Sequence, residues 1–435
     1  MSGPERARTI RTDVLTRVEG EGALEARVQD GEVTDVRLRI YEPPRFFEAF
    51  LRGRSFTEVA DLTSRICGIC PIAYQISALR AVEDACGVMI DSGPIRLLRR
   101  LIYCGEWIAS HSLHVYMLHA PDFLGYPGAV EMAREHPEIV ERGLAMKKVG
   151  NLVMATLGGR AIHPINLRVG GFHRLPTPQE LSGLVEPLRR ARETALATVD
   201  WAAGLPFPDG ELSCERVALC DGGDYPIDRG VVALGDRGRE VAVADFDACV
   251  VEHQVPHSTA LHARLREGGT YLTGPLARYD LASPALRPLA REAATNAGLA
   301  ATCANPSQSI IVRAVELVQA TDEALALIEA YEPTDAPAVE VTPRRGVGHG
   351  ASEAPRGLLY HRYELDDEGT ILDARIVPPT SQNQAAIEQD LHGVLQRHLE
   401  LDDDALRTRC EQTIRNYDPC ISCATHFLTL RIDRD

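Results

Sequence analysis

The chain has very little lysine and no apolar run long enough to cross a membrane. Lys147 and Lys148 are the only lysines among its 46 basic residues, and the others are arginine. No stretch approaches the roughly 18 uninterrupted apolar residues that a spanning helix needs, so we expect no membrane span. The first residues lack the apolar core of a secretory signal, and we expect a cytoplasmic protein, or one exported only with a partner.

Positive charge is also scarce relative to negative charge. The 435 residues include 62 acidic and 46 basic side chains, which gives a formal net charge of −16. Nucleic acid and anionic membrane surfaces would repel such a protein, so we expect neither as a partner. Apolar residues make up 45% and charged residues 25%, which is typical of a globular protein with a large core.

Cysteines are too few for a disulfide scaffold. There are eleven, an odd number, in 435 residues. Seven are scattered singly and are interpreted as small buried apolar residues: Cys86, Cys104, Cys214, Cys220, Cys249, Cys303 and Cys410. The other four form two C-x-x-C pairs, Cys67 with Cys70 and Cys420 with Cys423.

The apolar pattern predicts an α+β fold, with a large central helical bundle and small β elements from both ends of the chain. Residues 23–29 alternate, Asp30-Gly31 supplies a hairpin turn, and the alternation continues to Ile40. A second hairpin is predicted over 358–378, after a loop-like stretch at 332–350 that is rich in proline and glycine. Helical spacing recurs over 71–86, 94–119, 129–157, 178–203, 284–299, 307–331 and 381–399.

We expect one compact subunit over residues 1–435, because no linker or repeat interrupts it. Its N-terminal part, about 1–50, is predicted to be β-rich. A helical centre with a β insertion at 213–280 covers about 51–331, and a β hairpin and metal-binding end cover about 351–435.

The paired cysteines can supply four thiolates to one metal site. Zinc sites usually draw both pairs from one local module, whereas these pairs lie near opposite ends of the chain. Four soft thiolates suit zinc, nickel, or iron bound through sulfur. Spacing alone therefore leaves open a structural zinc site, a redox-active metal centre, or chance.

The residues around the cysteines resemble the two signatures of the nickel–iron hydrogenase large subunit. The signatures are Arg65-Ile66-Cys67-Gly68-Ile69-Cys70-Pro71 and Asp418-Pro419-Cys420-Ile421-Ser422-Cys423-Ala424-Thr425-His426. Further matches are Arg17-Val18-Glu19-Gly20, a helix with His114, His119 and Asp122, Gly159-Arg160-Ala161-Ile162-His163-Pro164 with Gly170-Gly171, Glu353-Ala354-Pro355-Arg356-Gly357, and Val377-Pro378-Pro379-Thr380. The resemblance thus covers most of the chain, and implies the fold of that subunit.

The resemblance implies that Cys67, Cys70, Cys420 and Cys423 all bind nickel. On matching positions, Cys70 and Cys423 also bridge to an iron that carries carbon monoxide and cyanide. A terminal thiolate keeps more basicity than a bridging one, because its electron density is not shared between two metals. The resemblance implies that Cys67 and Cys420 are the terminal nickel ligands, and Cys420 is therefore expected to accept a proton when dihydrogen splits heterolytically.

Two charged residues are implied to act beside the cysteines. Glu19 would carry the proton from Cys420 toward solvent, and Arg356 would lie over the open coordination position. Taken without the family, Glu19 is compatible with a solvated strand end and Arg356 with a surface turn. The loops that would line the diatomic ligands contribute Ala354, Pro355, Arg356, Val377 and Pro378.

The resemblance also implies a second ion and a maturation step. Glu48 and His426 match ligands of a magnesium or iron(II) ion, which a backbone carbonyl near Arg375 would complete. Nine residues follow His426, and we expect a dedicated protease to remove them once nickel is inserted. The alternation of Leu428, Leu430 and Ile432 is also compatible with a retained strand.

Departures from the broad pattern indicate a subgroup. Tyr74, which is followed by Gln75, stands where many family members have histidine. Glu21 also stands where histidine is common, and Ser110 stands where aspartate is common. The combination Cys70-Pro71-Ile72-Ala73-Tyr74-Gln75, with Asn416-Tyr417-Asp418-Pro419-Cys420, resembles the cytoplasmic, NADP-linked, sulfhydrogenase-type branch. That resemblance implies an iron–sulfur small subunit, further flavin- and NAD(P)-binding iron–sulfur subunits, and a maturation chaperone as partners.

Two motifs that an electron carrier would need are missing from the sequence. No G-x-G-x-x-G follows a strand, and no further cysteine cluster could hold a [4Fe–4S] cubane. Electrons from dihydrogen would therefore leave through partner subunits. The alternatives are a quinone-binding scaffold like the related complex I subunit, which has no use for four cysteines, and a structural Cys₄ zinc protein.

Overall fold

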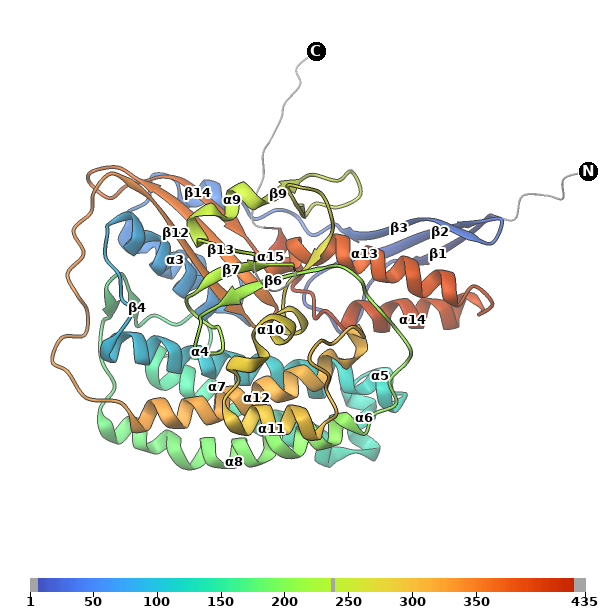
Figure 1. Ribbon diagram of the computed structural model, residues 1–435, viewed down its shortest axis with the longest axis horizontal. Helices are drawn as coiled ribbons and strands as arrows, with labels where there is room; N and C mark the ends of the chain where they lie inside the picture. Colours follow the sequence, from blue (N-terminus) through green and yellow to red (C-terminus); the bar gives the residue numbers. More distant parts are fainter. Residues whose placement is uncertain (1–6, 236–238, 426–435) are drawn as a thin grey trace, which may run out of the picture.

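Long helices form one layer of the molecule, and small sheets lie on the other side (Figure 1). The computed structural model describes residues 7–235 and 239–425. The helical layer contains α4 (Gly93–Leu113), α7 (Pro137–Gly158), α8 (Pro178–Ala203), α11 (Pro288–Asn296) and α12 (Ser309–Glu329). Helix α4 packs against both α7 and α12, and α12 also packs against α8 and α11. Among these residues no helix is long and apolar enough to cross a membrane.

Helix positions follow the predictions with two corrections. The single helix predicted over 129–157 is wrong, because α6 (Ala129–Glu135) ends before α7 begins at Pro137. Proline lacks the N–H that a continuing helix would need, and it suits a first helical turn. The helix predicted over 94–119 is regular only to Leu113, and His114–His119 then form a turn of π-helix.

The N-terminal hairpin is confirmed, and it belongs to a three-stranded antiparallel sheet. The sheet contains β1 (Ala7–Thr12), β2 (Gly22–Gln29) and β3 (Glu32–Ile40). Asp30 and Gly31 both have positive φ, 52° and 85°, as a two-residue hairpin turn requires. Helix α13 (Pro379–Arg397) packs on β3, and α14 (Asp403–Arg415), which the sequence did not predict, packs on α13.

The C-terminal sheet has one strand more than predicted. Strands β13 (Gly357–Leu365) and β14 (Ile371–Val377) form the expected hairpin, but β12 (Gly346–Ala354) pairs with β13 where a loop was predicted. Gly346, Gly348 and Gly350 face helix α3 (Pro71–Ala85) so closely that a Cβ on Gly348 would lie 2.0 Å from the carbonyl oxygen of Ala81. Glycine there permits close packing of strand on helix, not a turn.

The stretch 213–280 is strand-rich, as predicted. It contributes a four-stranded sheet in the order β11 (Tyr271–Leu272), β6 (Glu215–Cys220), β7 (Val231–Leu234) and β8 (Glu240–Val241). It also contributes the hairpin of β9 (Val250–His253) and β10 (His262–Leu265). The remaining described strands and α-helices are β4 (Leu167–Arg168), β5 (Gly171–Phe172), α1 (Phe47–Leu51), α2 (Val59–Ser64), α3 (Pro71–Ala85), α5 (Ala120–Leu124), α9 (Phe246–Cys249), α10 (Pro275–Ala282) and α15 (Ile421–Ala424).

The predicted α+β class is confirmed, and the main hydrophobic core joins its two layers. That core includes residues of α3, α4, α7, α8, α12 and α13, together with all four paired cysteines. The cysteines therefore lie inside the molecule and not on a peripheral metal-binding module.

Candidate metal centre

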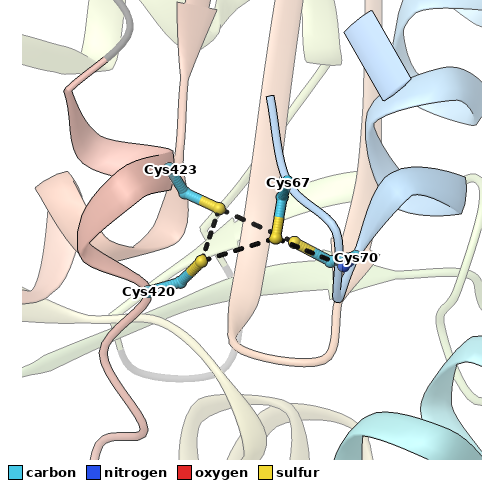
Figure 2. A group of neighbouring side chains, drawn as sticks. All are labelled: Cys67, Cys70, Cys420 and Cys423. Atoms are coloured by element: carbon cyan, nitrogen blue, oxygen red, sulfur yellow. Dashed lines mark hydrogen bonds between the residues drawn. The ribbon is translucent and has the colours of Figure 1, made fainter. Parts of the chain in front are cut away.

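The four paired cysteines converge on one point inside the core (Figure 2). Their sulfurs all lie within 4.8 Å of one another. The Cys67 and Cys420 sulfurs are 3.5 Å apart, and those of Cys70 and Cys423 are 3.7 Å apart. None of the four forms a disulfide. The predicted convergence of the two distant pairs is confirmed.

The first pair lies on the loop between α2 and α3. Cys70 is the residue before helix α3, whose first residue is Pro71. The buried carboxylate of Glu106 on α4 accepts the N–H groups of Ile72 at 2.6 Å and Ala73 at 3.1 Å. A carboxylate at a helix N-terminus satisfies unpaired donors there and complements the helix dipole. The sequence analysis did not predict this role for Glu106. An acidic residue on an otherwise apolar helix face could have indicated that its carboxylate is buried.

The second pair lies at α15 and is fixed mainly by backbone hydrogen bonds. The N–H of Cys420 donates to Thr380 Oγ1 at 3.0 Å, and the N–H of Ile421 donates to the carbonyl of Glu19 at 2.9 Å. Arg45 donates from one guanidinium nitrogen to the carbonyls of Ile66, at 2.7 Å, and Ser422. Arg45 thereby joins the loops of both cysteine pairs, which sequence reasoning did not anticipate.

Glu19 lies directly beside the second cysteine pair. Its Oε2 is 3.1 Å from Cys420 Sγ and accepts the N–H of Ser422 at 3.1 Å. Glu19 is half-buried, so one side of its carboxylate faces sulfur and the residue still reaches toward the surface. This position allows proton transfer between the Cys420 thiol and solvent.

Arg356 is buried at the tip of the β12–β13 hairpin, where the alternative of a surface turn is wrong. It is 3% exposed, and it donates from Nε to the carbonyl of Asp418 at 2.7 Å and from Nη2 to Asp418 Oδ1 at 3.1 Å. Burial favours a lower pKa for Arg356, but Asp418 and the sulfurs of Cys420 and Cys70 raise it well above its ordinary value. The guanidinium is thus a permanent cation beside the cysteines.

A buried ion network fixes the base of this hairpin. Arg278, fully buried on α10, pairs with Glu316 at 2.8 Å and with Glu353 at 3.0 Å. The same guanidinium donates to the carbonyls of Ala354, at 2.8 Å, and Pro355, at 3.2 Å. These bonds hold the turn that carries Arg356, and no sequence pattern predicted this role for Arg278.

The loops expected to line the diatomic ligands are buried. Ala354 and Pro355 precede Arg356, while Val377 ends β14 and Pro378 lies between β14 and α13. Arg356 Nη1 on the first loop and Ser381 Oγ in the first turn of α13 are buried and have no hydrogen-bond partner in the part of the chain that the structure describes. Donors left unpaired in an interior indicate an absent acceptor group.

The donor set fits a nickel–iron centre. Burial and the neighbouring sulfurs raise the pKa of Cys420 well above its ordinary value, so four adjacent thiols cannot all ionise without a cation. Soft thiolates suit zinc, nickel and iron, and nickel and iron are the metals that the family resemblance implies. The two unpaired donors would face acceptor ligands on the iron, which the cysteines alone do not supply.

The residues of the predicted second ion are placed only in part. Glu48 Oε1 accepts the N–H of Ile376 at 2.7 Å, next to the predicted backbone position near Arg375. Burial raises the pKa of Glu48 to about 8. His426 and the tail after it lie outside the described residues, so this site stays a prediction.

The histidine-bearing helix connects the two ends of the chain. His114 Nε2 donates to the carbonyl of Arg415 at 2.8 Å, and His119 Nε2 lies 3.0 Å from Asn416 Oδ1. Asp122 binds Arg415 through both oxygens, at 2.7 and 2.8 Å, and also pairs with Arg17. The segments that carry Glu19 and Cys420 therefore share one buried carboxylate.

Comparison with known proteins identifies related sequences along the whole chain. The family described as nickel-dependent hydrogenase matches residues 45–140 and 268–426. The sulfhydrogenase 2 subunit alpha of Pyrococcus furiosus is 33% identical over 424 residues, covering 97% of this chain and all of that protein. The NAD-reducing hydrogenase HoxS subunit beta of Cupriavidus necator is 27% identical over 471 residues, covering 97% and 95%.

A solved structure shares the fold over the same extent. The structure of an NAD⁺-reducing [NiFe]-hydrogenase in the H₂-reduced state superposes with a TM-score of 0.87 and 26% sequence identity. The match covers 96% of this chain and 99% of that one. The arrangement of helical layer and small sheets described above is therefore that of a known catalytic fold.

Proposed function

The chain belongs to the nickel-dependent hydrogenase family, and we propose that it is the catalytic subunit of a nickel–iron hydrogenase that cleaves dihydrogen reversibly and heterolytically. The observation that carries this proposal is the convergence of four cysteine sulfurs within 4.8 Å, beside Glu19 and Arg356. A structural zinc site needs four thiolates, but it needs neither a carboxylate beside one of them nor a buried cation.

The chain's own residues would handle the protons. When bound, the nickel–iron pair supplies the site at which dihydrogen is polarised and gives up two electrons. Cys420 Sγ would take one proton, and Glu19 Oε2, 3.1 Å away, would receive it and release it toward solvent. Arg356 would hold positive charge over the site, and the buried loops around it would exclude water.

Isotope exchange tests this function without a partner protein. The nickel-loaded subunit should form HD from D₂ in ordinary water, because exchange requires only cleavage and proton transfer at the site. Cys423→Ser should abolish both nickel binding and exchange. A subunit that holds one nickel and one iron but produces no HD would overturn the proposal.

Electrons would leave through partner subunits. We propose an iron–sulfur small subunit as the first acceptor and flavin- and NAD(P)-binding iron–sulfur subunits beyond it, in the cytoplasm. Support comes from two relatives whose names include sulfhydrogenase and NAD-reducing hydrogenase, each named as one subunit. Reduction of NAD(P) by dihydrogen should require the co-purified partners, and a subunit that reduces it alone would contradict this.

A second ion and a maturation step complete the proposal. Glu48 and His426 would hold magnesium or iron(II), supported by the position of Glu48 beside Ile376. A maturation chaperone would assist metal insertion, and a protease would cleave after His426. The intact mass of the nickel-loaded subunit tests cleavage, since a mass that includes the nine residues after His426 would contradict it.

A further inference from the structure

Two histidines and a glutamate form a second cluster of possible metal ligands. His257 lies in the loop between β9 and β10, His262 begins β10, and Glu388 lies in α13. One nitrogen from each histidine and one carboxylate oxygen of Glu388 all lie within 4.8 Å of one another. Glu388 is eight residues after Thr380, which places it about 12 Å along the helix from the residue that binds Cys420.

An ordinary ion pair accounts for only part of this cluster. His257 Nε2 lies 2.9 Å from Glu388 Oε1, and that oxygen also accepts the N–H of Leu38 at 2.8 Å. His262 is 3% exposed, yet its Nε2 has no hydrogen-bond partner among residues 7–235 and 239–425. Because buried polar atoms are nearly always partnered, this nitrogen indicates a missing ligand.

Gln384 lies beside the His262 ring and binds the loop that carries it. The Gln384 side-chain nitrogen donates to the carbonyl of Leu261 at 3.1 Å, and its oxygen accepts the Ser258 hydroxyl at 3.3 Å. A hydrogen bond between Gln384 and the His262 ring favours a higher pKa. Of the two ring nitrogens, Nε2 is the one without a partner, so it is free to bind a metal.

Two other imidazole rings lie beside His262. The His257 and His262 ring centres are 5.6 Å apart, and those of His253 and His262 are 6.0 Å apart. A neutral imidazole is the form that binds a metal ion.

We propose that His257, His262 and Glu388 bind one divalent ion of the zinc class, at a site separate from the four cysteines. Two imidazole nitrogens and one carboxylate oxygen are a donor set that zinc accepts, with water in a fourth position. Magnesium is disfavoured because it prefers octahedral oxygen ligands.

The ion would act as a structural clip. It would join the β9–β10 loop to the middle of α13, and through the Glu388–Leu38 hydrogen bond to strand β3. The first turn of α13 holds the Cys420 backbone through Thr380. The clip would thus help to hold the helix on which the second cysteine pair rests.

Metal analysis of the full-length, nickel-loaded protein tests the site. The wild type should bind about one zinc beyond the metals on the cysteines, measured by elemental analysis and by competition with a chromophoric chelator. His262→Gln should weaken zinc binding by more than about a hundredfold. Loss of a residue that only orients a metal ligand typically weakens binding by about a hundredfold at most. His173→Gln, at an exposed histidine outside the cluster, is the control and should bind zinc like the wild type.

A second variant distinguishes loss of the ligand from loss of the fold. Glu388→Gln keeps an oxygen to accept the Leu38 N–H but removes the carboxylate charge, so it should fold and still bind zinc much more weakly. X-ray absorption at the zinc edge should show nitrogen and oxygen neighbours only. Equal zinc in the wild type and both variants, no zinc in the wild type, or sulfur neighbours around the zinc would overturn the proposal. Because the readout is zinc, it stands or falls independently of hydrogenase activity.

Discussion

The carboxylate of Glu19 lies 3.1 Å from the sulfur of Cys420, although the two residues are 401 positions apart in the chain. The backbone sets this contact, because the carbonyl of Glu19 accepts the N–H of Ile421 in a short parallel bridge between the two segments. The side chain of Glu19 can therefore be changed without removing the bond that places it. Because the backbone positions Glu19 and the side chain would transfer the proton, a side-chain substitution tests the proton-transfer role alone.

Glu19→Gln should retain nickel and iron but lose exchange activity. The amide keeps an oxygen to accept the Ser422 N–H, yet it cannot accept and release a proton near neutral pH. We expect HD formation to fall by at least about a hundredfold, as for loss of a general base. Metal content and exchange rate should be measured on the same preparation.

The matched control for this variant is Glu21→Gln. Glu21 is exposed and lies two residues further along the same segment, so its change should leave exchange near normal. A Glu19→Gln protein with normal metal content and near-normal exchange would remove Glu19 from the proton pathway.

Arg356→Lys should lower turnover without loss of the metals. A lysine ammonium cannot reproduce the planar fork that binds both the Asp418 carbonyl and its carboxylate. Removal of one preorganised hydrogen-bond donor to a developing charge costs about a hundredfold or more in rate, so we expect turnover to fall by about that factor. Arg362→Lys, whose partner Asp373 lies near the surface, is the control. Equal turnover in the two variants would reject the proposed role of Arg356.

Each of the four cysteines should be required for nickel binding. Cys70→Ser should lose nickel, because a hydroxyl is a poor ligand for a site that selects soft thiolates. Cys249→Ser, at a half-buried cysteine outside the cluster, should bind nickel normally. Elemental analysis after maturation decides this, and full nickel content in Cys70→Ser would contradict the assignment.

Local sequence signals predicted the elements that depend on neighbouring residues. Asp30-Gly31 specified its hairpin, and the cysteine signatures indicated that two distant pairs share one site. Strand β12 was missed because Gly346, Gly348 and Gly350 have the composition of a loop, while their role is to let helix α3 approach. That role depends on helix α3, which lies more than 250 residues away in the sequence, so no local sequence pattern can predict it.

Buried charges were the least predictable part of the site. Glu106, Arg278 and Arg45 each fix a loop that carries a proposed catalytic or metal-binding residue. In the sequence such residues look like surface charges, because only tertiary contacts show that they are buried. Arg356 was predicted as a site residue only through the family resemblance, since a turn containing proline and glycine otherwise suggests the surface, and the structure shows that it is buried.

Asp122 joins the N-terminal and C-terminal segments of the site. Its side chain is 6% exposed, and that of its partner Arg415 is 3% exposed. Burial favours a higher pKa for Asp122, but hydrogen bonds and charge from Arg415 and Arg17 outweigh it and lower the pKa below the ordinary value. The carboxylate therefore stabilises the folded chain at neutral pH.

Asp122→Asn should destabilise the protein, and the loss should depend on pH. At pH 7 the variant leaves Arg415 and Arg17 without their buried counter-charge, which costs about 3 kcal/mol. Because the folded pKa of Asp122 is depressed, its contribution is complete above the ordinary aspartate pKa of about 4 and is lost as pH falls through the lower folded value. The difference in unfolding midpoint between wild type and variant should therefore be large at pH 7 and shrink below about pH 4.

The control is Asp61→Asn, which removes an exposed ion pair with Arg65 and should shift the unfolding midpoint little at either pH. A difference for Asp122→Asn that is the same at both pH values would show that the carboxylate charge is not what holds the two segments together.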